Sequence, residues 1–171
     1  CVMFLALAAQ ASAAQPVAGI PATALVPQPQ ALTMAAAEAP FALGHTVQIS
    51  APAALSGPAR LLATTLNLRL LDADAAKNAP DSGRAISFIL EPMPGAVTGA
   101  YRLQVRDSGI RIVAADAAGA FNGAQTLLQM LPPGEGARRA KGRPSIAVAA
   151  LDIADAPRFA WRGLTLDVAR H

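Results

Sequence analysis

Cysteine is nearly absent from this 171-residue chain, in which Cys1 is the single example. One cysteine excludes a disulfide within the chain and a zinc site built on cysteine ligands. The sequence also lacks HExxH, GxGxxG and Gly-Lys-Ser/Thr motifs, and its two histidines, His45 and His171, stand far apart. Without these motifs we expect no metal site, no nucleotide-phosphate site and no cofactor.

Aromatic and charged residues are scarce as well, at 4% and 15% of the chain, and the net charge is +3. The one dense basic run, residues 137–143 (ARRAKGR), lies between turns that contain proline and glycine. We interpret this run as a solvated loop and predict no nucleic-acid partner, because such a partner requires basic residues gathered on one face. The 14 prolines and 13 glycines favour strands, turns and loops over a helical bundle.

The first 16 residues, CVMFLALAAQASAAQP, contain a short apolar run followed by small residues. This pattern predicts a secretory signal peptide over residues 1–14 that lacks its own start, with cleavage after Ala13 or Ala14. The run is shorter than the roughly 20 apolar residues of a membrane span, so we expect no span and export to the periplasm or beyond. A lipidated Cys1 is the alternative, and it is disfavoured because the cysteine precedes the apolar run. Residues 15–24 are interpreted as a linker.

Periodicity in the next part of the chain predicts strands that alternate with helices. Residues 25–34 (LVPQPQALTM) indicate a proline-containing extended segment, 45–50 (HTVQIS) a strand and 85–91 (AISFILE) a buried strand. Between the two strands, residues 57–75 (GPARLLATTLNLRLLDADA) predict a helix. Its expected apolar face consists of Ala59, Leu62, Leu66 and Leu70.

A hairpin gives the clearest local signal. In residues 101–116 (YRLQVRDSGIRIVAAD), apolar and polar residues alternate on both sides of Asp107-Ser108-Gly109, which leaves one side solvated. Residues 116–131 predict a helix capped by Asp116, and residues 145–155 (SIAVAALDIAD) predict one further strand. The expected apolar stripe of this second helix is Phe121, Ala124, Leu128 and Leu131. This order predicts an α+β domain over residues 25–155, with a mixed or antiparallel sheet and two helices on one of its faces.

The last stretch, residues 157–171 (PRFAWRGLTLDVARH), reads as a fresh apolar strand flanked by charged residues. A buried arginine is costly unless its charge is paired or bound by a ligand, so Arg162 implies either a structural ion pair or a contact with a ligand. Asp167, Arg170 and His171 would lie at the C-terminal end of this strand, which is where barrel enzymes place their sites.

Four stretches together resemble one known family. Residues 155–171 (DAPRFAWRGLTLDVARH) resemble the junction into the catalytic barrel of family 20 glycoside hydrolases, the β-N-acetylhexosaminidases, whose typical form is PRF-x-x-RG-x-x-x-D-x-x-RH. The stretches LVPQPQAL, AYRLQV…GIRIVA and GAFNGAQTLLQML agree in the same order, so the resemblance covers nearly all of residues 25–171. Two scaffold positions depart from the pattern: Asn122 stands where an aromatic residue is usual, and Gly99 where an acid is common.

The resemblance implies a zincin-like domain without zinc over residues 25–155, followed over residues 156–171 by the first strand of a truncated (β/α)8 barrel. It implies hydrolysis of terminal β-linked N-acetylglucosamine or N-acetylgalactosamine from amino-sugar oligosaccharides, with the substrate's own acetamido oxygen as nucleophile. The family's catalytic Asp-Glu pair lies beyond this segment, so no catalytic residue is expected within it. Arg162 matches the arginine that binds sugar hydroxyls, while Asp167, Arg170 and His171 match positions interpreted as support for the pocket.

Two other functions are weaker alternatives. A self-contained secreted module that binds carbohydrate or another partner is the main alternative, and it is disfavoured because Trp161 and Tyr101 are the only tryptophan and tyrosine available to stack on sugars. A protease, suggested by the zincin-like topology, is opposed by the missing HExxH motif.

Overall fold

A computed structural model describes residues 16–71, 84–133, 144–159 and 163 of the chain. The predicted signal peptide, the basic run 137–143 and the four predicted site residues, Arg162, Asp167, Arg170 and His171, lie outside the described residues. None of the helices in the described ranges has the length and apolar character needed to cross a bilayer.

Seven strands form the main sheet, and its pairing is mixed, in agreement with the sequence prediction. Strand β10 pairs antiparallel with β2 and β7, and β7 with β8, whereas β8, β6, β4 and β5 run parallel to one another. Their order across the sheet is β2 (Ala31–Met34), β10 (Leu151–Asp155), β7 (Tyr101–Arg106), β8 (Gly109–Ala114), β6 (Ala85–Leu90), β4 (Gln48–Ser50) and β5 (Arg69–Leu71).

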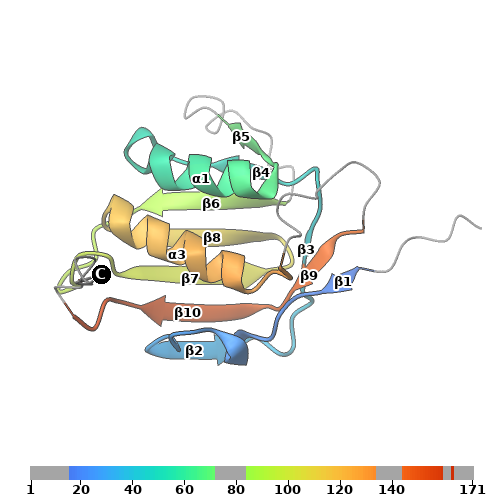
Figure 1. Cartoon of the computed structure of the whole chain (residues 1–171), viewed down its shortest axis with the longest axis horizontal. Coiled ribbons are helices and arrows are strands. Elements are labelled where there is room, and N and C mark those ends of the chain that lie inside the picture. Colours follow the sequence, from blue (N-terminus) through green and yellow to red (C-terminus); the bar gives the residue numbers. More distant parts are fainter. Residues whose placement is uncertain (1–15, 72–83, 134–143, 160–162, 164–171) are drawn as a thin grey trace, which may run out of the picture.

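Two helices, α1 (Ser56–Leu66) and α3 (Ala117–Gln129), lie side by side on one face of this sheet (Figure 1). This arrangement confirms the predicted α+β class with both helices on one face. Two short 3-10 helices, η1 (Ala22–Ala24) and η2 (Ala53–Leu55), complete the helical elements of the described chain. The core lies between the helices and the sheet, and it contains Leu62, Ile112 and Leu127, each fully buried.

The hairpin alternates as predicted. Tyr101, Leu103 and Val105 are buried among the core residues, while Arg102 is exposed on the opposite face of the sheet. Asp116 is the N-cap of α3 and accepts a hydrogen bond from the Gly119 amide at 2.7 Å. A carboxylate at this position satisfies an amide that has no partner within the helix.

The predicted helix over residues 57–75 was too long. The helix ends at Leu66 because Asn67 adopts a left-handed conformation (φ 50°), which asparagine tolerates better than most residues. The Leu68 amide then bonds back to the Ala63 carbonyl at 2.9 Å. Leu70, predicted on the apolar face of the helix, belongs instead to strand β5.

The predicted apolar stripe of the second helix was right in part. Ala124 is fully buried and Leu131, just after the helix, is 5% exposed, whereas Phe121 is 44% exposed. The buried residues of α3 are Gly119, Ala120, Gly123, Ala124 and Leu127. The reason is close packing, because a Cβ at Gly123 would lie 2.8 Å from Ile112 Cγ2. The smallest residues therefore form the contact face.

The single strand predicted over residues 145–155 is in fact two strands in different sheets. Strand β9 (Ile146–Val148) joins β1 (Val17–Ala18) and β3 (Phe41–Leu43) in a three-stranded sheet that was not predicted. Strand β10 begins only at Leu151. Residues 16–24, expected to be a linker, also pack on the domain in this structure, since β1 pairs with β9 and Ala22 is 2% exposed.

Candidate functional site

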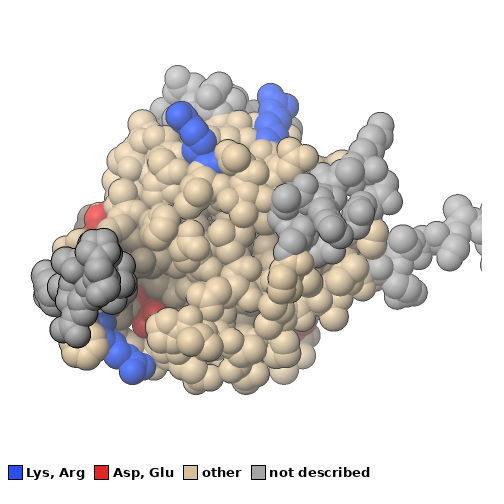
Figure 2. Space-filling model, viewed as in Figure 1, with Lys and Arg blue, Asp and Glu red and all other residues tan. Residues whose placement is uncertain are grey.

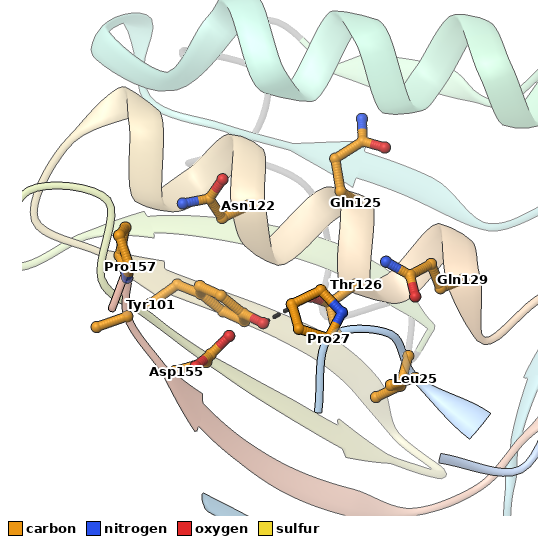
Figure 3. Close-up of a pocket in the computed structure, with 10 residues that line it drawn as sticks. Leu25, Pro27, Tyr101, Asn122, Gln125, Thr126, Gln129, Asp155 and Pro157 are labelled. Carbon is orange, nitrogen blue, oxygen red and sulfur yellow. Dashed lines mark hydrogen bonds between the residues drawn. The ribbon is translucent and has the colours of Figure 1, made fainter. Parts of the chain in front are cut away.

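A pocket of about 130 Å³ opens beside α3, between the end of β10 and the segment around Pro27 (Figure 3). Its walls come from four separate parts of the sequence, and most of its polar groups come from α3. The lining residues are Leu25, Pro27, Tyr101, Asn122, Gln125, Thr126, Gln129, Asp155, Ala156 and Pro157.

Tyr101 forms the floor of the pocket. It is the first residue of β7 and alternation turns it toward the helices, where it is only 3% exposed. Its hydroxyl lies 2.6 Å from Thr126 Oγ1 on α3, and Figure 3 shows the Asp155 carboxylate turned toward the same ring. Burial raises the pKa of Tyr101 to about 12, and the nearby Asp155 charge adds to the rise while the Thr126 hydrogen bond opposes it. The hydroxyl therefore stays neutral at physiological pH.

Asp155 ends β10 and fixes the neighbouring N-terminal segment. Its Oδ1 accepts a hydrogen bond from the Gln30 amide at 3.1 Å, and Gln30 Nε2 donates to the Ala156 carbonyl at 3.0 Å. On the other side of the pocket, Gln129 Oε1 accepts from the Val26 amide at 3.1 Å. These bonds hold residues 26–30 against the ends of α3 and β10, so the pocket has fixed walls on both sides.

The two positions at which the chain departs from the family pattern lie together at the other end of the pocket. Asn122 Nδ2 donates to the Gly99 carbonyl at 2.8 Å, and the Gly99 amide donates to Asp116 Oδ2 at 3.1 Å. Gly99 has a positive φ of 86°, and a Cβ there would lie 2.9 Å from Pro157 Cγ. A residue with a side chain would be strained in this conformation and would meet the ring of Pro157.

A second polar cluster lies on the open face of the sheet, away from the helices. Arg106 Nη2 lies 2.7 Å from Asp152 Oδ2, Arg106 Nε lies 3.2 Å from Glu38 Oε1, and Gln104 Nε2 donates to Asp152 Oδ1 at 3.1 Å. The hydrogen bond from Arg106 lowers the pKa of Asp152. The cluster joins β7, β10 and the turn after β2, and its side chains already bind one another.

The pocket contains a single carboxylate. Glycosidases use two acting groups around the bond, usually a pair of carboxylates, and the pocket offers Asp155 alone. Within residues 16–71, 84–133 and 144–159, no group of three His, Cys, Asp or Glu side chains could hold a metal ion. The pocket can supply hydrogen-bond donors and acceptors, so its chemistry is that of binding or of packing against another surface.

Of residues 157–171, the structure describes Pro157, Arg158, Phe159 and Gly163, and Pro157 lines the pocket. The sequence did not single out Tyr101 and Asp155 as neighbours, since they are 54 positions apart and meet only through the β7–β10 pairing. Their positions in the sequence could have indicated a shared site, because Asp155 directly precedes residues 157–171 and Tyr101 begins the hairpin.

Comparisons with known proteins agree on one family. The family model described as "Glycosyl hydrolase family 20, domain 2" matches residues 22–156. The chain is 39% identical over 90 residues to the β-hexosaminidase subunit beta of Entamoeba histolytica and 42% identical over 72 residues to the β-N-acetylhexosaminidase of Cellulomonas fimi. These matches span 53% and 42% of this chain, but only 15% and 13% of those proteins.

Solved structures give the same result. The N-acetyl-β-hexosaminidase of Streptomyces plicatus is 29% identical with a TM-score of 0.64, and the match covers 86% of this chain and 29% of that one. The family 20 β-N-acetylhexosaminidase of Streptomyces coelicolor is 28% identical with a TM-score of 0.65, covering 84% of this chain and 28% of that one. The described domain thus corresponds to less than a third of each of these structures.

Proposed function

The chain belongs to glycosyl hydrolase family 20, and from this premise we propose that it is the N-terminal part of a β-N-acetylhexosaminidase. The observation that carries the proposal is the family match over residues 22–156, which is accompanied by two Streptomyces hexosaminidases with the same fold. The whole protein would remove terminal β-linked N-acetylglucosamine or N-acetylgalactosamine from oligosaccharides. The described residues would support that reaction without taking part in its chemistry.

The proposed mechanism is retaining and substrate-assisted. The substrate's 2-acetamido oxygen would attack the anomeric carbon, an Asp would orient the acetamido group, and a neighbouring Glu would act as general acid and base. We place both carboxylates beyond this segment, because the pocket contains only Asp155 and the match covers under a third of the solved relatives.

Residues 156–171 are proposed to begin the (β/α)8 barrel, and the domain before them to have zincin-like topology without zinc. Arg162 would then bind hydroxyls of the terminal sugar, for which its five fixed N–H donors are suited. Asp167, Arg170 and His171 would lie at the end of the same strand and support the sugar pocket. What supports this assignment is the match of residues 157–171 to the family motif.

Export is proposed from the signal-like residues 1–14, with the periplasm or the medium as the destination. N-terminal sequencing of the secreted product tests it. A mature chain that begins at residue 14 or 15 supports export, and recovery of the protein in the cytoplasm with its N-terminus uncleaved contradicts it.

The alternative of a self-contained carbohydrate-binding module finds little support in the fold. Sugar-binding modules stack exposed aromatic rings on the sugar face, and Tyr101 is 3% exposed with its ring beneath α3. Among the described residues, the most exposed aromatic side chain is Phe159, at 73%, and it belongs to the family motif.

The enzyme itself gives the decisive test. The full-length protein should release nitrophenol from nitrophenyl N-acetyl-β-glucosaminide, and Arg162→Ala should lower kcat/KM by about 10- to 100-fold, because charged hydrogen bonds to the sugar are lost. Arg84→Ala, at the exposed position directly before β6, is the matched control and should leave kcat/KM unchanged. Absence of hydrolysis would overturn the proposed function, whereas unchanged kinetics in Arg162→Ala would remove only Arg162 from the site.

A further inference from the structure

The two faces of the main sheet differ in charge. The eleven residues of α1 and the thirteen of α3, which cover one face, contain a single charged residue, Arg60. Figure 2 views this helix-covered side and shows a broad central area without lysine, arginine, aspartate or glutamate. On the open face, three arginines come from the central strands: Arg102 and Arg106 on β7, and Arg111 on β8. Positive charge is therefore gathered on the open side of the sheet.

The strand register places these three arginines next to one another. Arg111 pairs with Gln104 across the β7–β8 hairpin, and Arg102 and Arg106 lie two positions to either side of Gln104 on β7. Each of them is thus a diagonal neighbour of Arg111, at a backbone separation of roughly 7–8 Å. Like charges at this spacing repel one another, and a bound anion removes that repulsion.

Only one of the three arginines has carboxylate partners among the described residues. Arg106 Nη2 lies 2.7 Å from Asp152 Oδ2, and Arg106 Nε lies 3.2 Å from Glu38 Oε1. Arg102 and Arg111 are exposed, and neither forms an ion pair with a carboxylate in the described ranges. A guanidinium without such a partner can bind both oxygens of a carboxylate from another molecule.

The surface beside Arg111 is polar and built from small side chains. The strand pairing continues from Arg111 to Ser87 on β6 and to Ser50 on β4, and the two serine hydroxyls lie 3.2 Å apart. Neighbouring strands are about 4.8 Å apart, so this row, which starts at Gln104, is about 14 Å long. Amide, hydroxyl and guanidinium groups in one line suit an extended chain that carries both hydroxyls and carboxylates.

The composition of this face distinguishes among anionic partners. Single-stranded nucleic acids bind where aromatic rings stack on the bases, but the aromatic residues of the main sheet, Phe88 and Tyr101, are both 3% exposed. Binding to a membrane surface uses large apolar side chains that enter the lipid boundary, and β7 and β8 carry none that is exposed. A polar and positively charged surface of this kind favours an acidic polysaccharide.

We propose that the open face of the main sheet, centred on Arg102 and Arg111, binds an acidic polysaccharide. The two arginines bind carboxylates of its sugars, and the polar row from Gln104 to Ser50 contacts hydroxyls. The choice of a polysaccharide among anionic polymers rests on the proposed function, in which the whole protein acts on amino-sugar oligosaccharides. Such a surface holds the enzyme on a glycan that bears carboxylates.

Oligogalacturonate, a chain of uronic acids without an amino sugar, is the probe, and it is titrated into the full-length protein in a calorimeter. Measurements are made at about 50 mM salt, where charge interactions are only partly screened. The double variant Arg102→Gln/Arg111→Gln should raise the dissociation constant at least about tenfold, because two charged hydrogen-bonding groups are lost. Arg60→Gln removes the same charge from α1 and is the matched control, with an unchanged dissociation constant. Methyl-esterified oligogalacturonate, which lacks the negative charges, should not bind.

Equal binding by the double variant and the native protein would overturn the proposal, as would equal binding of the esterified chain. Tighter binding of oligothymidylate, or of phosphatidylglycerol vesicles, would also overturn it, because either result would assign the surface to another class of partner.

The nitrophenyl assay separates this inference from its premise. Full hexosaminidase activity without binding of oligogalacturonate would sink the polysaccharide surface and spare the proposed function. Binding that depends on Arg102 and Arg111, in a full-length protein without that activity, would support the surface and overturn the proposed function.

Discussion

Replacement of Gly119 by alanine tests the packing that brings α3 onto the sheet. A Cβ at this position would lie 2.1 Å from the Ala100 carbonyl oxygen and 3.1 Å from Ala114 Cβ. The nearest atom belongs to the backbone, so no side-chain rotation can relieve the contact. Asp116 holds that same backbone in place, because it accepts hydrogen bonds from the amides of both Gly99 and Gly119. The substitution must therefore displace the helix or break this connection.

The expected loss follows from two opposing effects. Overpacking of a tight core typically costs about 1–3 kcal/mol, and a backbone contact belongs in the upper part of that range. Alanine in place of glycine favours a helix by about 0.8–1 kcal/mol. Gly119→Ala should therefore lower the free energy of unfolding by about 2 kcal/mol. Gly57→Ala in α1 is the matched control, since a Cβ there meets nothing within 4 Å, and it should raise stability by about 0.5–1 kcal/mol.

Urea and thermal unfolding, followed by circular dichroism, measure both effects. For a domain of this size, 2 kcal/mol corresponds to a midpoint about 4–8 °C lower. Gly123→Ala should fall between the other two variants, because its added Cβ meets side-chain atoms of Ile112 and Tyr101, which can shift. The close-packing argument fails if Gly119→Ala is as stable as Gly57→Ala.

Three further changes probe the polar contacts. Asp116→Ala should lower the free energy of unfolding, measured in urea, by about 1–2 kcal/mol, because the cap of α3 and its hydrogen bond to Gly99 are lost. Asp116→Asn should lower it by less, because asparagine can also cap a helix. Tyr101 should remain un-ionised well above pH 10 in a difference spectrum against Tyr101→Phe, and ionisation near pH 10 in the native protein would contradict its burial. Because its pKa of about 12 in the folded protein lies above the unfolded value of 10.0, the free energy of unfolding should fall as the pH rises from 10 toward 12. A double-mutant cycle between Arg106→Ala and Asp152→Ala should give a coupling of about 0.2–1 kcal/mol at neutral pH, because Asp152 is half-exposed. That coupling should disappear as the pH falls through the lowered pKa of Asp152, and a coupling that does not change with pH would rule out the ion pair as its source.

The sequence predicted the parts of the fold whose pattern is long and local. The hairpin alternates over twelve strand residues, and the cap at Asp116 is a local rule, so both are found where expected. The end of α1 was missed because Leu66 and Leu70 have helical spacing, and only the left-handed Asn67 between them breaks the helix. Strand β4 lies within the strand predicted over residues 45–50, but the three-residue strands β3 and β9 are too short to show a period of their own. Their assignment depends on pairing partners that are remote in sequence.

The candidate pocket was less predictable than the fold, for the same physical reason. Tyr101 and Thr126 come from a strand and a helix, and their hydroxyls meet only because Gly123 lets the helix approach the sheet closely. The sequence indicated neither of the bonds that the side chains of Asn122 and Gln129 on α3 make to backbone groups. It could not show that these residues border one cavity at the end of β10.

The two positions that depart from the family pattern, Gly99 and Asn122, are neighbours in the fold. Gly99 and Asn122 are 23 positions apart, and in sequence each looks like an independent loss of a typical residue. In the fold they share one space: a Cβ at Gly99 would lie 3.0 Å from Asn122 Nδ2, whose amide reaches the Gly99 carbonyl. An acid at position 99 would need the room that this amide and Pro157 now occupy, and an aromatic ring at position 122 could not make the amide's hydrogen bond. Gly99 and Asn122 therefore belong to one local arrangement, which lies beside Pro157 just after the end of β10.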